Sequence, residues 1–140
     1  MRAVGTGAAR ALAVGFAAFT SFVCSHGIAA AAPITATPFQ IPLIQGAVVF
    51  AGPCSTVPCI ETFIATTGTE PGVTIFTVSG EQAISSGPYW VHWHNLATGA
   101  SGVATVTHAE PAVVRSGIGP VTAVATGTNA LAGSGMFFAV

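Results

Sequence analysis

Trp90, His92 and His94 stand at alternate positions of one short segment, and they are the residues of this chain best suited to bind a ligand. On a β-strand, side chains at positions i and i+2 share one face about 7 Å apart, so two imidazoles there could hold one zinc or copper ion. Two ligands do not complete such a site. The candidates for a third ligand are Glu61, Glu70, Glu81, Glu110 and His108. We therefore predict no metal, keep His92 and His94 as the alternative metal pair, and treat Trp90, His92 and His94 as a candidate binding face.

The segment 89–108 has the pattern of a β-hairpin with Thr98-Gly99 as its turn. In that register His92 faces Thr105 and His94 faces Val103. Alternation then points one set of side chains into the core, namely Tyr89, Val91, Trp93, Ala104 and Val106, and the other set outward, namely Trp90, His92, His94, Thr105 and Thr107. His108 falls on the face opposite the histidine pair. A longer loop that begins at Asn95 is the alternative.

The two tryptophans divide along the same line. Trp93 is expected between the sheets, where sandwich domains often hold one aromatic side chain. Trp90 is expected outside, as the type of residue that anchors a protein or sugar contact, unless a neighbouring loop packs over it.

Cys54 and Cys59 are predicted to form a disulfide bond. In an exported protein both lie in an oxidising space, and they are the two cysteines that remain once Cys24 leaves with the leader. Closing this short loop stabilises the fold by about 2 kcal/mol in the chain-entropy model. A redox role is disfavoured because the spacing is not Cys-x-x-Cys and no helix start follows.

Residue types that most enzymes need are scarce. The chain has no aspartate, so it cannot form a Ser-His-Asp triad, although glutamate could replace aspartate in principle. Its four glutamates are scattered, which gives no carboxylate pair for glycoside cleavage. The glycines at 117–120 lack the helix that a phosphate-binding loop opens. We predict a protein that is not an enzyme and has no cofactor.

The elements that must position these residues are short strands rich in Val, Ile, Thr and aromatic residues, separated by Gly and Pro turns. The predicted strands are 43–51, 60–66, 73–79, 89–96, 102–108, 112–115, 121–125 and 135–140. Seven or eight such strands in about 110 residues indicate one antiparallel β-sandwich domain, with a closed barrel as the alternative. The prolines in residues 32–42 favour an extended lead-in.

Residues 1–31 have the order of a secretory signal peptide: a basic start, an apolar run from Ala11 to Cys24, and a stretch of small residues. Ala29 and Ala31 suit signal peptidase, so we expect cleavage after Ala31, with Ala32 as the alternative, and a mature domain of residues 32–140. The apolar run is too short for an anchored span, and no transmembrane helix is expected in the mature chain. The protein should be secreted or held at the cell envelope.

Without the leader, the chain keeps one arginine, Arg115, against four glutamates and has no lysine, a net charge of −3. Nucleic acid is a poor partner, because neutralising phosphates needs clustered Lys or Arg. Electrostatic repulsion keeps a surface with so few charges only weakly apart from other molecules. We expect partners that are apolar or uncharged, such as envelope components, a glycan or further copies of this chain.

Three stretches carry a resemblance to a known group of proteins, namely the hairpin 91–102, the Gly117-Ile118-Gly119-Pro120 stretch with the residues after it, and the closing Gly135–Val140. Together with the alanine-rich leader end, they resemble small secreted actinobacterial proteins of uncharacterised function. The resemblance covers the last half of the chain and implies an immunoglobulin-like β-sandwich. It carries no catalytic motif.

Three functions follow from these residues. The first is a non-enzymatic secreted β-sandwich that is structural, adhesive or binding at the envelope. The second is a metal-binding protein that uses His92 and His94. The third is a membrane-inserting or pore-forming β subunit, suggested by low charge and the Phe137-Phe138 terminus, although its strands are short for spanning.

Overall fold

The computed structural model describes residues 32–45, 59–80, 88–128 and 130–140. The predicted leader, together with Cys54 and Glu81, lies outside the described residues.

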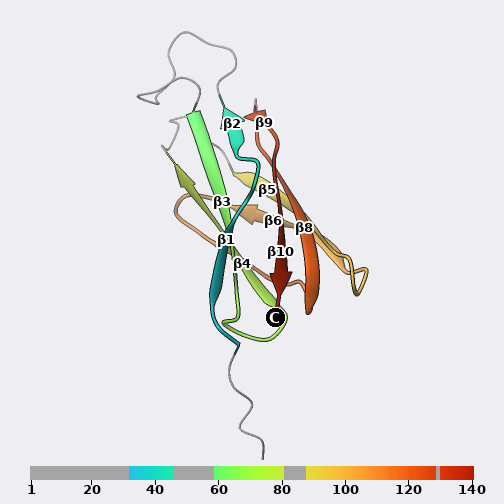
Figure 1. Ribbon diagram of the computed structural model, residues 1–140. Coiled ribbons are helices and arrows are strands. Elements are labelled where there is room, and N and C mark those ends of the chain that lie inside the picture. The colour runs from blue at the N-terminus through green and yellow to red at the C-terminus, as the bar shows by residue number, and fades with distance from the viewer. Residues whose placement is uncertain (1–31, 46–58, 81–87, 129) are drawn as a thin grey trace, which may run out of the picture.

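The described chain forms two antiparallel sheets packed as a sandwich (Figure 1). The larger sheet has the order β7-β4-β3-β2-β9, with β1 also paired to β3. Its strands are β1 (Thr35–Pro38), β2 (Leu43–Gln45), β3 (Cys59–Thr67), β4 (Val73–Gly80), β7 (Ala112–Arg115) and β9 (Ala130–Leu131). The smaller sheet has the order β10-β8-β5-β6. Its strands are β5 (Tyr89–Asn95), β6 (Ser101–Val106), β8 (Gly119–Thr126) and β10 (Gly133–Ala139).

The predicted all-β antiparallel sandwich is confirmed. The strands predicted from residue 60 onward agree with β3 to β8 and β10 to within two residues, whereas β1 and β9 were not predicted. Residues 46–51 of the strand predicted at 43–51 lie outside the described residues. The agreement follows from alternation: β3 and β8 bury every second residue, which is the pattern of strands with one face on a core. The described residues include no helix long and apolar enough to cross a membrane.

The core lies between the sheets and is built around aromatic rings. Phe63 of β3 meets Tyr89 of β5 edge to face with ring centroids 5.3 Å apart, and Phe76 of β4 meets Phe137 of β10 at 5.8 Å. Each pair joins one sheet to the other, and edge-to-face pairs add to the free energy of plain burial. These contacts fix which face of the smaller sheet is turned outward.

The predicted lead-in, residues 32–42, contributes to this fold in two ways. It supplies β1, which pairs antiparallel with β3 from Thr35 opposite Thr67 to Pro38 opposite Ile64. It also supplies Phe39, which is buried in the core cluster. Gly135 makes room for it, because a Cβ there would lie 2.8 Å from the Phe39 ring.

Candidate functional site

Strand β5 holds the predicted binding residues in the middle of the smaller sheet, between β8 and β6. Trp90, His92 and His94 point outward and are exposed, whereas Tyr89 and Val91 are buried. The backbone alternation alone turns these three side chains to one face. The sheet therefore brings them together in one row, as their spacing predicts.

The predicted turn of the β5–β6 hairpin is wrong. Trp90 pairs with Thr105, and His92 with Val103, so the pairing is shifted by two residues and the loop between the strands is the five residues 96–100. A shift of two residues keeps every side chain on its predicted face, which a shift of one would not. The outcome is the longer loop that was the alternative, with Asn95 as the last residue of β5 and the loop directly after it.

Asn95 is the physical reason for the longer loop. Its backbone N–H donates to the carbonyl of Ala100 at 2.8 Å, and its side-chain oxygen accepts from the N–H groups of Ala97 and Thr98 at 2.9 and 3.1 Å. Gly99 then closes the loop with a positive φ of 74°. A side chain that satisfies two loop donors stabilises this turn over a two-residue one.

The outer face of β10, β8, β5 and β6, here called the outer face, is uncharged. The four strands contain no Asp, Glu, Lys or Arg. Apolar side chains on them are well exposed: Trp90 at 38%, Val103 at 58% and Phe138 at 59%. Val124 and Met136 are exposed beside them. Large exposed apolar areas on a soluble domain mark contact surfaces.

Hydroxyl groups lie between the apolar groups on the outer face. Trp90 stands between Thr105 of β6 and Thr126 of β8, and His94 stands between Ser101 and Thr122. Thr126 and Thr122 donate to the backbone carbonyls of Trp90 and His94 at 3.3 and 3.4 Å. Their oxygens keep acceptor capacity toward an outside donor.

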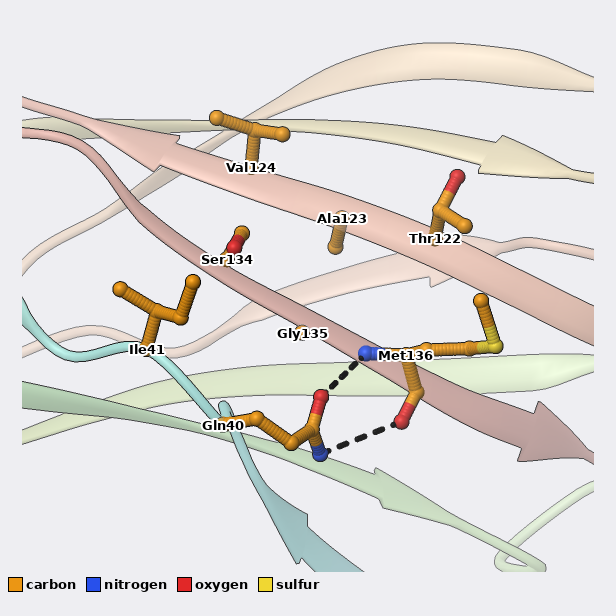
Figure 2. A pocket seen from close by; sticks show the side chains of 8 residues that line it. All are labelled: Gln40, Ile41, Thr122, Ala123, Val124, Ser134, Gly135 and Met136. Atoms are coloured by element: carbon orange, nitrogen blue, oxygen red, sulfur yellow. Dashed lines mark hydrogen bonds between the residues drawn. The ribbon is translucent and has the colours of Figure 1, made fainter.

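The outer face is hollowed between β8 and β10 (Figure 2). The hollow has a volume of about 290 Å³, with Ala123 and Gly135 at its floor and Ile41 and Val124 at its sides. At one end, the side-chain amide of Gln40 forms two hydrogen bonds with the backbone of Met136. Its lining is mostly apolar, like the rest of the face.

A metal site at His92 and His94 lacks a further ligand within the described chain. The neighbours of His92 across the sheet are Val103 and Val124, and those of His94 are Ser101 and Thr122. No group of three or more His, Cys, Asp or Glu side chains that could hold a metal occurs among the described residues. Of the expected third ligands, Glu61 and His108 lie elsewhere, against each other.

Glu61 and His108 form a buried polar cluster that the sequence reasoning missed. Glu61 on β3 is fully buried, and its Oε1 lies 3.3 Å from Nε2 of His108, a side chain that is only 16% exposed. The Tyr89 hydroxyl donates to the same Oε1 at 3.4 Å and accepts from the Gln45 amide at 2.9 Å. The available signal was alternation, because Glu61 stands between the inward residues Cys59 and Phe63.

The environment of Glu61 disfavours its charge. Burial raises the pKa of the Glu61 carboxyl above its ordinary value of 4.5, and the nearby His108 and Tyr89 oppose this only in part. Its second oxygen, Oε2, has no hydrogen-bond partner among the described residues. Gly80 faces Glu61 across the β3–β4 pair, and a Cβ there would lie against Oε2, so a glycine leaves room for the carboxylate.

The predicted disulfide stays a prediction, because Cys54 lies outside the described residues. Its predicted partner, Cys59, begins β3 and is buried.

Comparison with known proteins finds no match: no protein family, no curated protein and no solved structure is significantly similar to the chain. The resemblance to small secreted actinobacterial proteins therefore stays a prediction.

Proposed function

We propose that this protein is a non-enzymatic secreted β-sandwich that binds an uncharged polymer of the cell envelope, such as a neutral glycan, through its outer face. The observation that carries the proposal is the chemistry of that face: exposed apolar side chains, interleaved hydroxyl and imidazole groups, and no fixed charge on its four strands.

A neutral glycan matches both the apolar groups and the polar groups of this face. A sugar ring has an apolar C–H face, which packs on an aromatic ring such as Trp90, and a rim of hydroxyl groups. Thr105 and Thr126 flank Trp90, and His92 follows on the same strand, so hydroxyl and imidazole partners surround the stacking position. An anionic polymer would find no lysine or arginine on the four strands of this face.

Export supports the same proposal. The signal-peptide pattern of residues 1–31 implies delivery outside the cytoplasm, where the envelope polymers lie and where a Cys54–Cys59 bond can form. A scarcity of charge suits a protein that lies against uncharged material.

The strand connectivity supports an immunoglobulin-like topology within this proposal. In such domains strands A, B and E share one sheet, and C, F and G the other, with C′ added beyond C in some of them. The orders β3-β4-β7 and β10-β8-β5-β6 correspond to A-B-E and G-F-C-C′. In this assignment Trp90, His92 and His94 lie on strand C.

The test is retention of the purified protein on insoluble uncharged polysaccharides, namely cellulose, chitin and an α-glucan. We expect at least one to retain it, with no loss on raising sodium chloride to about 0.5 M, because screening acts only on charges. Trp90→Ala should weaken retention about tenfold or more. The matched control is Val113→Ala, an exposed apolar residue on β7 of the other sheet, which should change nothing.

Two results would overturn the proposal. One is that none of the three polymers retains the protein. The other is that Trp90→Ala and Val113→Ala reduce retention equally, which would mean that contact is not made through the outer face.

A further inference from the structure

Within the described part of the chain, strand β6 is an open edge of the smaller sheet. Among these residues it pairs with β5 alone, and no other of them forms a hydrogen bond to its backbone. The hydrogen bond from the Asn95 N–H to the Ala100 carbonyl shows which residues of β6 direct their backbone groups toward β5. In an antiparallel pair every second residue directs its N–H and C=O to the partner, so those of Ser101, Val103 and Thr105 point away from β5. All three residues are exposed.

The opposite edge of the same sheet is closed. On β10, Ser134 exchanges two backbone bonds with Ile41, at 2.9 and 2.8 Å. Gln40 then continues the pairing with its side chain, accepting from the Met136 N–H at 2.7 Å and donating to the Met136 carbonyl at 3.3 Å (Figure 2). Its amide acts as one more residue of a neighbouring strand.

The edge strands β7 and β9 of the larger sheet are protected in the usual ways. Edge strand β7 has four residues, follows Pro111 and ends on Arg115, and edge strand β9 has two residues. Short length, proline and charge are the devices that keep strand edges from pairing with other molecules. Strand β6, with the sequence Ser-Gly-Val-Ala-Thr-Val, has no charge and no proline.

We propose that β6 pairs antiparallel with β6 of a second copy of this chain, about a two-fold axis at Val103. This register sets Val103 opposite Val103 of the second copy and Ser101 opposite its Thr105. Each backbone N–H and C=O that points away from β5 then meets a C=O or N–H of the second copy, which gives about six hydrogen bonds in all. On the outer face, valine then meets valine and serine meets threonine. These are favourable cross-strand pairs, and no like charges oppose each other. This self-complementarity favours a second copy over an unrelated peptide.

The dimer joins two four-stranded sheets into one continuous sheet. It uses the edge of β6 and leaves the outer face uncovered. The inference therefore goes beyond the proposed function and does not depend on what the outer face binds.

The test is sedimentation equilibrium of the full chain after export, from about 1 to 200 μM. We expect a concentration-dependent dimer. Val103→Lys should raise its dissociation constant about tenfold or more, because the substitution sets two positive charges opposite each other across the axis. The matched control is Val124→Lys, which lies in the same row of the outer face but on the interior strand β8, and it should leave the constant unchanged.

Amide hydrogen exchange gives an independent readout. The N–H groups of Val103 and Thr105 should exchange more slowly at high protein concentration than at low. A protein that stays monomeric throughout overturns the inference. So does a dimer that Val124→Lys disrupts as strongly as Val103→Lys, since that would be face-to-face packing. Thermal unfolding of both variants shows that each remains folded.

Discussion

At the scale of single residues, Glu61 is held in the core at a cost in free energy at neutral pH. Its carboxyl is buried, one oxygen has no hydrogen-bond partner in the described part of the chain, and the pKa is raised above 4.5. The folded state therefore holds the proton more tightly than the unfolded state. The stability contributed by this group is fully present below pH 4.5 and is lost as the pH rises through the folded-state pKa.

Glu61→Gln should therefore stabilise the protein at pH 8 relative to the original chain, and the gain should shrink as the pH falls toward 4.5. Glutamine has nearly the same shape and can still accept from the Tyr89 hydroxyl, but it cannot ionise. The measurement is the free energy of unfolding from urea titrations at several pH values. Glu110→Gln, which removes a carboxyl at an exposed position, is the matched control. A gain that is the same at every pH would contradict this account.

At the scale of elements, the β5–β6 hairpin depends on Asn95 more than on its turn sequence. This side chain is fully buried and accepts two loop N–H groups with its oxygen. With its nitrogen it donates to the carbonyls of Ser116 and Ile118, at 2.9 and 3.2 Å. One residue thus joins the hairpin loop to the strand connection before β8.

We expect Asn95→Ala to lower the free energy of unfolding by about 2–3 kcal/mol, because it leaves donors in the loop and acceptors near β8 without partners. Asn95→Asp separates the hydrogen bonds that the side chain accepts from those that it donates. Its carboxylate can still accept from the loop N–H groups, but it cannot donate to the carbonyls of Ser116 and Ile118. Thr98→Ala, which removes a hydroxyl that accepts only an exposed loop N–H, should cost under about 1 kcal/mol. Equal losses for Asn95→Ala and Thr98→Ala would show that Asn95 does not hold the hairpin. Chemical denaturation of the three variants decides this.

The hairpin also shows which features of the structure can be predicted from the sequence. Alternation along 89–94 predicted the faces of Trp90 and His92 correctly, because the period of two is a local property of the strand. The turn was mispredicted because Asn95 is fixed by contacts with Ser116 and Ile118, about twenty residues away in sequence. Glu61 was missed for a related reason, since glutamate in an inward position is read as exposed until its partners are known.

At the scale of the whole molecule, the signal-peptide prediction has consequences that can be measured on one sample. Protein collected from the medium should begin at Ala32, after cleavage behind Ala31, and should lack Cys24. It should also be two hydrogen masses lighter than its reduced form, through a Cys54–Cys59 bond.

Reducing that bond should lower the free energy of unfolding by about 2 kcal/mol. Intact-mass spectrometry before and after reduction, with N-terminal sequencing, measures the first two expectations, and thermal unfolding measures the third. Cys54→Ser together with Cys59→Ser is the matched variant and should be insensitive to reductant. Free thiols on the exported protein would refute the predicted pairing.

Strand β6 is adjacent to β5 in the same sheet, and this adjacency determines what a dimer could do. Pairing through β6 sets the two β5 strands about 14 Å apart, three strand spacings, with both outer faces turned the same way. The assembly would be bivalent toward a single polymer chain, and the second contact would form at high effective concentration. Avidity of this kind can strengthen binding by about 10²–10⁴ with no new contact, so a long polymer would be held far more tightly than its short fragments.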